Sequence, residues 1–335
     1  MDINENGLTE LVRDLRSSSK YIVPEDFKTY PIDFGSQLFF KMLAKEGPFD
    51  IVVNFAAHKH VRSEKDMYSI EAMIENNVIR AKKLLDVLSE KPPEHFFCVS
   101  TDKAANPVNI MGASKKLMEE VIMAYSKIIP ITTARFANVA FSNGSLLAGF
   151  VDRLNKKQPL VCPSDVKRFF VSPQESGQLC LLASILGESG DIFYPKLDMK
   201  NGLLALSEIV VSFIKAFGFS PDFCKSEEEA KEKAVLLNAS SVLYPVYLFD
   251  TNTSGEKTFE EFYTEEDMLD VESFINLGVI KNSKKISLVD VTDIVYNLTT
   301  LLQKDCSKPD VVSALKKYLP NFNHIETGKN LDDKM

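Results

Sequence analysis

The feature that most constrains the fold is the apolar run FDIVVNFAA at residues 49–57. Such a run is expected for a strand that is buried on both faces, as strands of parallel sheets usually are. A long helical stretch follows at about residues 68–88, and a second strand, HFFCVS, at residues 95–100. Strands that alternate with helical stretches predict a parallel sheet covered by helices.

The rest of the first 140 residues continues this alternation. Apolar residues at helical spacing predict helices at 8–15, 38–44 and, as an amphipathic helix, 112–128, and β-like runs predict strands at 27–33 (FKTYPID) and 131–139 (ITTARFANV). We therefore expect an α/β fold with a doubly wound, Rossmann-like parallel sheet in residues 1–140.

After about residue 140 the pattern becomes looser. Helices are predicted at 145–156, 173–186, 226–235, 286–303 and 308–318, and strands at 159–162 and 246–250. We expect residues 141–335 to form a smaller C-terminal part that binds substrate, with an imprecise boundary near residue 140.

Composition excludes several classes of protein. A net charge of −8 and a pI near 5.3 give no basic face for a nucleic acid. No apolar run approaches the roughly 20 residues of a membrane span, and the first residues lack the pattern of a signal peptide. Five scattered cysteines indicate reduced thiols, and four histidines without metal-ligand spacing indicate no metal site. The sequence thus predicts a cytoplasmic protein without a membrane or nucleic-acid partner.

The stretch CVSTDKAANPVNIMGASKK at residues 98–116 carries the chemistry. A predicted strand ends at Ser100 and delivers Thr101, Asp102 and Lys103 at its carboxyl end, where open parallel sheets bind ligands. These side chains offer a hydrogen-bond donor, a potential acid and a potential base.

The helix that follows places Met111 and Lys115 one turn apart on the same face. An alternative stays open: Asp102 caps a turn and Lys115 is a solvated surface charge, as most such charges are.

The whole string resembles a known family. Ser-Thr-Asp-Lys-Ala, Asn-Pro and Met-Gly-Ala-Ser-Lys are similar to the CapD-like polysaccharide-biosynthesis dehydratases of the extended short-chain dehydrogenase/reductase family. Further matching segments are NFAAHKHV (54–61), Asn76-Asn77-Val78, ARFANVAFSNGSL (134–146) and VKRFFVSPQESGQL (166–179). The resemblance covers roughly residues 1–200, and TSGEKTFEEFYTEEDML (253–269) is similar to the tail of a branch that makes nonulosonic (legionaminic) acid precursors.

The resemblance implies a sugar-nucleotide 4,6-dehydratase that acts on a UDP-linked N-acetylhexosamine, in particular UDP-N-acetylglucosamine. It also implies NAD as cofactor, with NADP as the alternative, and a homo-oligomer. A sugar-nucleotide epimerase and a catalytically silent sugar-nucleotide-binding paralogue remain alternatives.

The resemblance also implies catalytic roles. Thr101 would hydrogen-bond the sugar 4-hydroxyl, Asp102 would protonate the departing 6-hydroxyl, and Lys103 would remove the C5 proton. Lys115 would bind the nicotinamide ribose. Met111 occupies the position of the usual catalytic tyrosine and has no proton to move. The 4-hydroxyl proton must therefore go to Lys103, Asp102, Lys115 or water.

The binding residues follow from the same resemblance. Those implied for the cofactor are Asp2, Asp33 near the adenine, Ala56, Ala57, Asn77, Ser100 and Lys115. Those implied for the substrate are His60 and, as phosphate or uracil contacts, Lys59, Asn138 and Arg168.

The sequence departs from the family at its start, where no Gly-x-Gly-x-x-Gly or Gly-x-x-Gly-x-x-Gly occurs. That motif would hold the cofactor pyrophosphate at a helix N-terminus. The first residues are similar to those directly after the family's second strand, so we expect a longer natural polypeptide or a fragment. Asp2 would accept hydrogen bonds from the adenosine ribose and repel a 2′-phosphate, which favours NAD, or it precedes a helix as a cap.

Overall fold

The computed structural model describes residues 1–20, 22–197, 202–251, 260–281 and 286–328. Its larger body is built on a six-stranded sheet in the order β1-β2-β3-β8-β13-β12. The strands are β1 (Ile51–Asn54), β2 (His95–Thr101), β3 (Ile131–Phe136), β8 (Ile192–Pro195), β13 (Leu277–Lys281) and β12 (Met268–Asp270). The first four strands are parallel to one another, β13 is antiparallel to β8, and β12 is antiparallel to β13.

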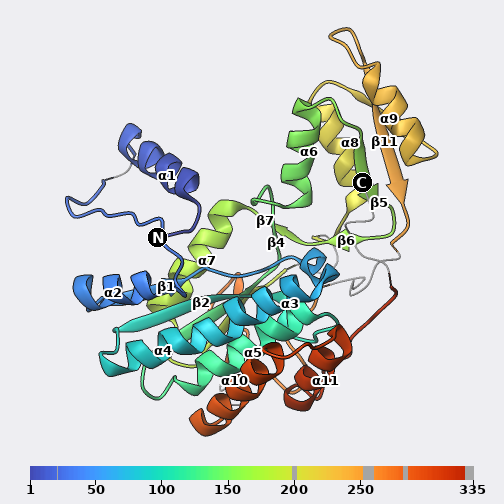
Figure 1. Ribbon diagram of the computed structural model, residues 1–335. Helices are drawn as coiled ribbons and strands as arrows, with labels where there is room; N and C mark the ends of the chain where they lie inside the picture. The colour runs from blue at the N-terminus through green and yellow to red at the C-terminus, as the bar shows by residue number, and fades with distance from the viewer. Residues whose placement is uncertain (21, 198–201, 252–259, 282–285, 329–335) are drawn as a thin grey trace.

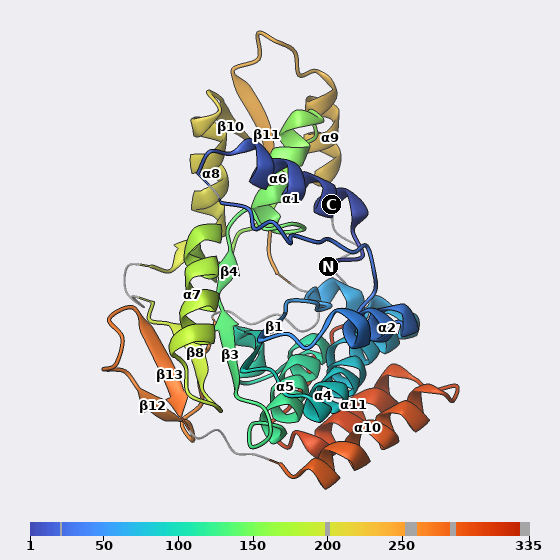
Figure 2. The ribbon, with the colours of Figure 1, turned by 90° about the vertical axis from the view of Figure 1, so that its left-hand side faces the viewer.

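Helices cover both faces of this sheet (Figure 2). One face carries α3 (Met67–Ile74), a π-helical turn (Glu75–Ile79), α4 (Arg80–Glu90), α5 (Ile110–Ala124), α10 (Leu288–Leu302) and α11 (Lys308–Tyr318), and the other carries α7 (Pro173–Leu186). Because side chains alternate along a strand, Phe96 of β2 packs in the core under α5, while Phe97 packs with Leu179 of α7. The predicted α/β fold with a mostly parallel, helix-covered sheet is confirmed.

A smaller body lies beside the first (Figure 1). Its parallel sheet has the order β10-β11-β5, with β10 (Ser220–Cys224), β11 (Leu243–Phe249) and β5 (Leu160–Pro163). The sheet packs with α6 (Leu146–Asn155), α8 (Leu206–Ala216) and α9 (Glu227–Val235). Phe150, Leu160, Val210 and Val246 form the centre of its separate core.

Short strand pairs and two N-terminal helices complete the described chain. The pairs are β4 (Asn138–Val139) with β7 (Phe170–Val171) and β6 (Lys167–Arg168) with β9 (Leu204–Ala205), and the helices are α1 (Glu5–Ser17) and α2 (Gln37–Glu46). Among the helices of the described ranges, none is both long and apolar enough to cross a bilayer.

The chain passes between the two bodies more than once. Strands β8, β12 and β13 and helices α7, α10 and α11 follow residue 140 yet belong to the larger body. The predicted division into two domains, residues 1–140 and residues 141–335, does not coincide with these two bodies and stays a prediction.

Two sequence predictions at the N-terminal side are wrong. Strand β1 is not buried on both faces: Ile51 is 53% and Val53 42% exposed, because β1 is the edge strand and no described element covers that face. Residues 27–33 do not form a strand and make only one bridge, between Asp2 and Pro31. A strand needs backbone hydrogen bonds to a neighbouring segment over several residues, and in the described chain only Asp2 pairs with residues 27–33.

Helix α5 also differs from its prediction. It begins at Ile110 and ends at Ala124, and it is buried almost all round rather than amphipathic. The reason is that α4, α10 and α11 pack against it from outside the sheet. The helices predicted at 145–156, 173–186, 226–235, 286–303 and 308–318 are confirmed as α6, α7, α9, α10 and α11, to within two residues at each end.

Candidate active site

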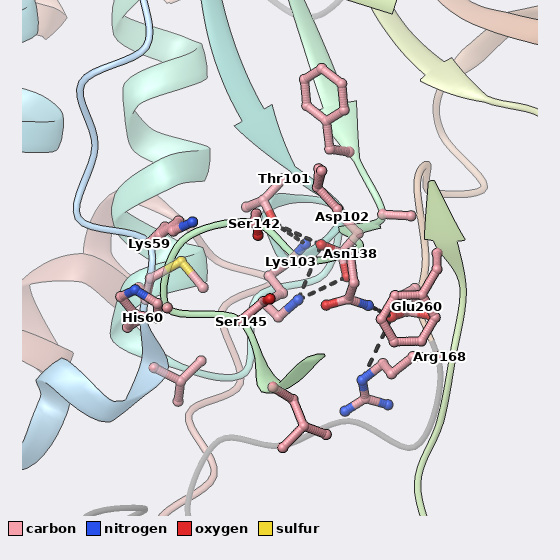
Figure 3. Close-up of a pocket in the computed structure, with 18 of the residues that line it drawn as sticks. Lys59, His60, Thr101, Asp102, Lys103, Asn138, Ser142, Ser145, Arg168 and Glu260 are labelled. Carbon is pink, nitrogen blue, oxygen red and sulfur yellow. Dashed lines mark hydrogen bonds and ion pairs between the residues drawn. The ribbon is translucent and has the colours of Figure 1, made fainter. Parts of the chain in front are cut away.

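A cavity of about 1030 Å³ opens at the carboxyl ends of β2 and β3 and is lined by residues of both bodies. Its size lies at the upper end of the range for small-molecule sites. The cavity brings together most of the residues predicted from sequence: Ala57, Lys59, His60, Ser100, Thr101, Asp102, Lys103, Met111, Lys115, Asn138 and Arg168. Figure 3 shows its central part.

The turn after β2 places a hydroxyl, a carboxylate and an amine side by side. Thr101 ends the strand in an extended conformation and begins a short 3₁₀ turn, Asp102–Ala104. The Thr101 hydroxyl donates to Asp102 Oδ1 at 2.6 Å, and Lys103 Nζ lies 3.2 Å and 3.1 Å from the two Asp102 carboxylate oxygens (Figure 3). Asp102 is only 4% exposed, so it is a buried, paired acid and more than a cap of a surface turn.

Lys115 is buried as well, which excludes the solvated alternative. It is 3% exposed, and its Nζ donates to the Val99 carbonyl at 2.6 Å. Within the described chain no carboxylate lies within ion-pair distance of it, and burial lowers the pKa of its amine. A buried ammonium without a counter-ion is costly, and such groups cluster at functional sites.

The start of α5 is held tightly against the 3₁₀ turn that follows β2. Asn109 caps the helix by accepting from Gly112 N at 2.7 Å, and Met111 N donates to Glu64 Oε1 at 2.9 Å. A Cβ on Gly112 would lie 2.6 Å from the Lys103 carbonyl oxygen, so only glycine permits this approach. Met111 itself lines the cavity with an apolar side chain.

Asn77 holds the loop that carries the predicted phosphate ligands. From the π-helical turn its Oδ1 accepts from His58 N at 2.9 Å, and its Nδ2 donates to His58 O and Ser114 Oγ at 3.0 Å. These bonds fix the loop with Lys59 and His60, whose pKa values are both lowered, first by burial. Asn77 thus acts on the cavity through the backbone, although its role toward a cofactor remains a prediction.

Besides Asn77, three of the predicted cofactor residues do not line the cavity: Asp2, Asp33 and Ala56. Asp33 binds Arg80 Nη1 with both carboxylate oxygens, at 2.9 Å and 2.8 Å. Asp2 accepts from the backbone of Asn4, which is the residue that caps α1, and Ala56 N donates to Asn54 Oδ1. Their contacts to a dinucleotide remain predictions.

Sequence reasoning missed Glu260, a carboxylate in the cavity that is 5% exposed. Glu260 Oε1 accepts from Asn138 Nδ2 and lies 3.6 Å from Arg168 Nε, and Oε2 accepts from Phe169 N at 3.1 Å. Burial, and then the nearby Asp102 charge, raise the pKa of Glu260. The sequence feature that could have indicated Glu260 is the segment 253–269, which resembles the family branch and contains this residue. Residues 253–259 of the segment lie outside the described ranges.

Positively charged side chains also line the cavity, namely Lys59, Arg62, Arg153 and Arg168. Burial lowers the pKa of Arg153, and the charge of Arg62 lowers it further, so two guanidinium groups face the same space. Like charges that converge on a cavity favour an anionic ligand, and guanidinium groups suit phosphate. No three His, Cys, Asp or Glu side chains of the described residues come together to hold a metal ion.

The fit to a nicotinamide dinucleotide can be tested at two ends. The nicotinamide–ribose end fits, because the buried Lys115 ammonium lines the cavity and lacks a carboxylate partner in the described chain. For the pyrophosphate end the sequence supplies no glycine-rich motif before a helix. The residues of this chain therefore identify a place for one half of the cofactor.

Comparison with known proteins places the chain in a family. The sequence model of a family described as "polysaccharide biosynthesis protein" matches residues 4–282, and the chain belongs to this family. An uncharacterized membrane protein of Methanocaldococcus jannaschii is 27% identical over 84% of this chain and 76% of its own length. The capsular polysaccharide biosynthesis protein CapD of Staphylococcus aureus is 29% identical over 67% of this chain, which spans only 38% of CapD.

Solved structures share the fold. The protein Pen of Bacillus thuringiensis superposes with a TM-score of 0.65 at 18% identity, over 88% of each chain. The dTDP-glucose 4,6-dehydratase of Bacillus anthracis, solved in complex with NAD, superposes with a TM-score of 0.52 at 16% identity, over 76% of this chain and 75% of its own. At this level of identity the likeness establishes the fold alone.

Proposed function

We propose that the protein is a sugar-nucleotide 4,6-dehydratase that acts on a UDP-linked N-acetylhexosamine, in particular UDP-N-acetylglucosamine. The observation that carries the proposal is the ion pair of the buried Asp102 with the half-buried Lys103 at the end of β2, in the same cavity as the buried Lys115. The family match supports a role in polysaccharide biosynthesis, and we propose more narrowly that the product is a precursor of surface polysaccharide or nonulosonic acid.

A bound nicotinamide would accept the hydride from C4 of the sugar and return it to C6. The side chains of this chain move the protons. Lys103 removes the C5 hydrogen, which the C4 ketone makes acidic, and Asp102 protonates the departing 6-hydroxyl. These roles need a neutral amine and a neutral acid, a state that differs from the ion pair by one proton moved across the 3.1 Å contact.

Thr101 and Lys115 serve the oxidation step. Because the Thr101 hydroxyl donates its hydrogen to Asp102, its oxygen is left to accept a hydrogen bond from the 4-hydroxyl. Met111 cannot take the 4-hydroxyl proton. The 4-hydroxyl proton passes to Lys103, Asp102, Lys115 or water, and the Lys115 amine holds the nicotinamide ribose.

The diphosphate binds among the cations of the cavity, Lys59, Arg62, Arg153 and Arg168. The use of NAD rather than NADP, the homo-oligomeric state and the cytoplasmic location are further parts of the proposal. A catalytically silent paralogue is disfavoured, because it would gain nothing from a buried acid beside an amine and from a buried ammonium without a carboxylate partner.

The test is a reaction with UDP-N-acetylglucosamine and NAD in deuterated water, followed by mass spectrometry and NMR. The wild type should lose one water and incorporate deuterium at C5. Lys103→Ala should abolish both, by at least about a hundredfold, and Asp102→Asn should slow water loss by as much while C4 oxidation continues. Lys116→Ala is the matched control, because Lys116 is the next residue of α5 and does not line the cavity.

Two outcomes would contradict the mechanism. If Lys103→Ala keeps normal C5 exchange, Lys103 is not the base. If the wild type interconverts C4 epimers without loss of water, the epimerase alternative is correct.

A further inference from the structure

The Asn138 side chain is held in one orientation by two acceptors. Its Nδ2 donates to the Glu260 carboxylate and to the Phe169 carbonyl at 3.3 Å. A carbonyl oxygen can only accept, so the amide nitrogen must lie on this side. Asn138 Oδ1 accepts no hydrogen bond from the described residues, and Figure 3 shows it turned away from Glu260, toward Lys103 and Ser145.

Glu260 is itself held in place by a second set of contacts. Its Oε2 accepts from Phe169 N at 3.1 Å, and Arg168 Nε lies 3.6 Å from Oε1. The carboxylate therefore joins the segment after residue 259 to the β4–β7 pair. It is 5% exposed and close to Asp102, so its burial is costly unless it serves the site.

We propose that Glu260 is a positioning residue that turns the Asn138 amide so that its oxygen accepts a hydrogen bond from the sugar of the substrate. The donor is a ring hydroxyl or the acetamido N–H. This inference rests on the proposed function and deepens it, because it assigns the specificity of one side of the sugar pocket.

The same geometry makes Asn138 unsuited to the phosphates for which the sequence suggested it. An amide oxygen and a phosphate oxygen are both acceptors and repel each other. The phosphate contacts then belong to the cations of the cavity. Asn138 lies beside Asp102 and Lys103 in Figure 3, so its partner belongs to the sugar ring near the reacting carbons rather than to the distant base.

The test compares the affinities of UDP-N-acetylglucosamine and UDP by titration calorimetry, which needs no turnover. In Glu260→Gln the charged acceptor is replaced by an amide that can present either a donor or an acceptor, and only the 3.3 Å bond to the Phe169 carbonyl still favours the original orientation, so Asn138 is held less firmly. The dissociation constant for UDP-N-acetylglucosamine should rise about tenfold or more, and that for UDP should stay within about twofold, because only the sugar contact is lost. The control is Glu266→Gln, the same substitution at an exposed position of the same segment.

A reciprocal pair of variants separates orientation from a general structural effect. Asn138→Asp places two carboxylates together and should weaken sugar binding as strongly as Glu260→Gln. In the double variant the amide introduced at position 260 can donate to the carboxylate introduced at position 138, whose second oxygen again faces the cavity as an acceptor. The double variant should therefore bind UDP-N-acetylglucosamine more tightly than either single variant.

The outcomes are distinguishable. If the wild type binds UDP-N-acetylglucosamine no more tightly than UDP, the proposed substrate is wrong, and this inference is wrong with it. If the wild type prefers the sugar nucleotide but Glu260→Gln weakens both ligands equally or neither, or the double variant shows no recovery, the inference about Glu260 alone is overturned.

Discussion

At the scale of single residues, Lys115 is the side chain of the site whose burial most lowers the stability of the folded protein. Its amine is buried, with a backbone carbonyl rather than a carboxylate as its hydrogen-bonded oxygen. Burial lowers the pKa of Lys115 in the folded protein, so the unfolded chain binds this proton more tightly. Stability therefore rises with pH between the lowered pKa and the ordinary value of 10.5, and at neutral pH the cost is present. A site that binds an electron-rich ligand group carries such a cost until the ligand arrives.

Replacement of Lys115 by methionine should stabilise the ligand-free protein and abolish turnover. The apolar side chain removes the buried charge at similar volume, so the free energy of unfolding at pH 7 should rise by about 0.5–2 kcal/mol. Urea unfolding at pH 7 and pH 9 measures this, and the gain should shrink at pH 9. Lys116→Met, at the partly exposed neighbour, should change stability by less than about 0.5 kcal/mol. A destabilised Lys115→Met would mean that the surroundings already compensate the charge.

The sequence predicted the residues whose role follows from local geometry. Thr101, Asp102 and Lys103 are consecutive at a strand end, and any parallel sheet would present them together. Glu260 was missed because its role arises from a contact with Asn138 across 122 positions. No local pattern reports such a contact.

At the scale of elements, the decisive arrangement is the junction of β2, its 3₁₀ turn and α5. The burial of α5 could not be read from its own residues, because it depends on α10 and α11, which come more than 160 positions later. The exposed side of β1 does not follow from its hydrophobicity, which shows that a strand can be buried and not what covers it. The bounds of the helices α7, α10 and α11 were predicted closely, and each of these helices starts at a Ser-based capping box, which is a local feature of the sequence.

Gly112→Ala tests this junction. The added Cβ would meet the Lys103 backbone oxygen at 2.6 Å, so the turn or the helix must shift. Stability should fall by about 1–3 kcal/mol. Turnover should fall more than tenfold with a smaller change in KM, because misplaced catalytic groups affect the reaction more than binding. Steady-state kinetics and thermal unfolding measure both.

The control is Gly177→Ala, in α7 with nothing within 4 Å of its Cβ, which should leave stability equal or slightly higher. Unchanged turnover in Gly112→Ala would show that the contact does not position Lys103.

At the scale of the whole molecule, the site is shared by two bodies with separate cores. The larger body supplies the groups to which we assign proton transfer, and the smaller supplies one face of α6. That face consists of Leu146, Gly149, Phe150 and Arg153, which all line the cavity at the spacing of a single helical face. The ligand therefore connects the two bodies when it binds.

Hydrogen exchange followed by mass spectrometry should detect this connection. At about 100 times the dissociation constant, UDP-N-acetylglucosamine stabilises the bound state by about 2.7 kcal/mol, which slows exchange about a hundredfold wherever opening requires ligand release. We expect this protection in the first turns of α5 and also in α6, whereas α11, which does not line the cavity, serves as the internal reference.

Arg153→Ala should remove the protection of α6 and keep that of α5, because Arg153 is the charged contact of the smaller body with the diphosphate. Lys156→Ala, directly after the same helix but not lining the cavity, should leave both unchanged. Protection of α5 alone in the wild type would mean that the ligand is held by the larger body and that α6 forms only a wall. Protection of α6 that survives Arg153→Ala would place the diphosphate among the other cations of the cavity.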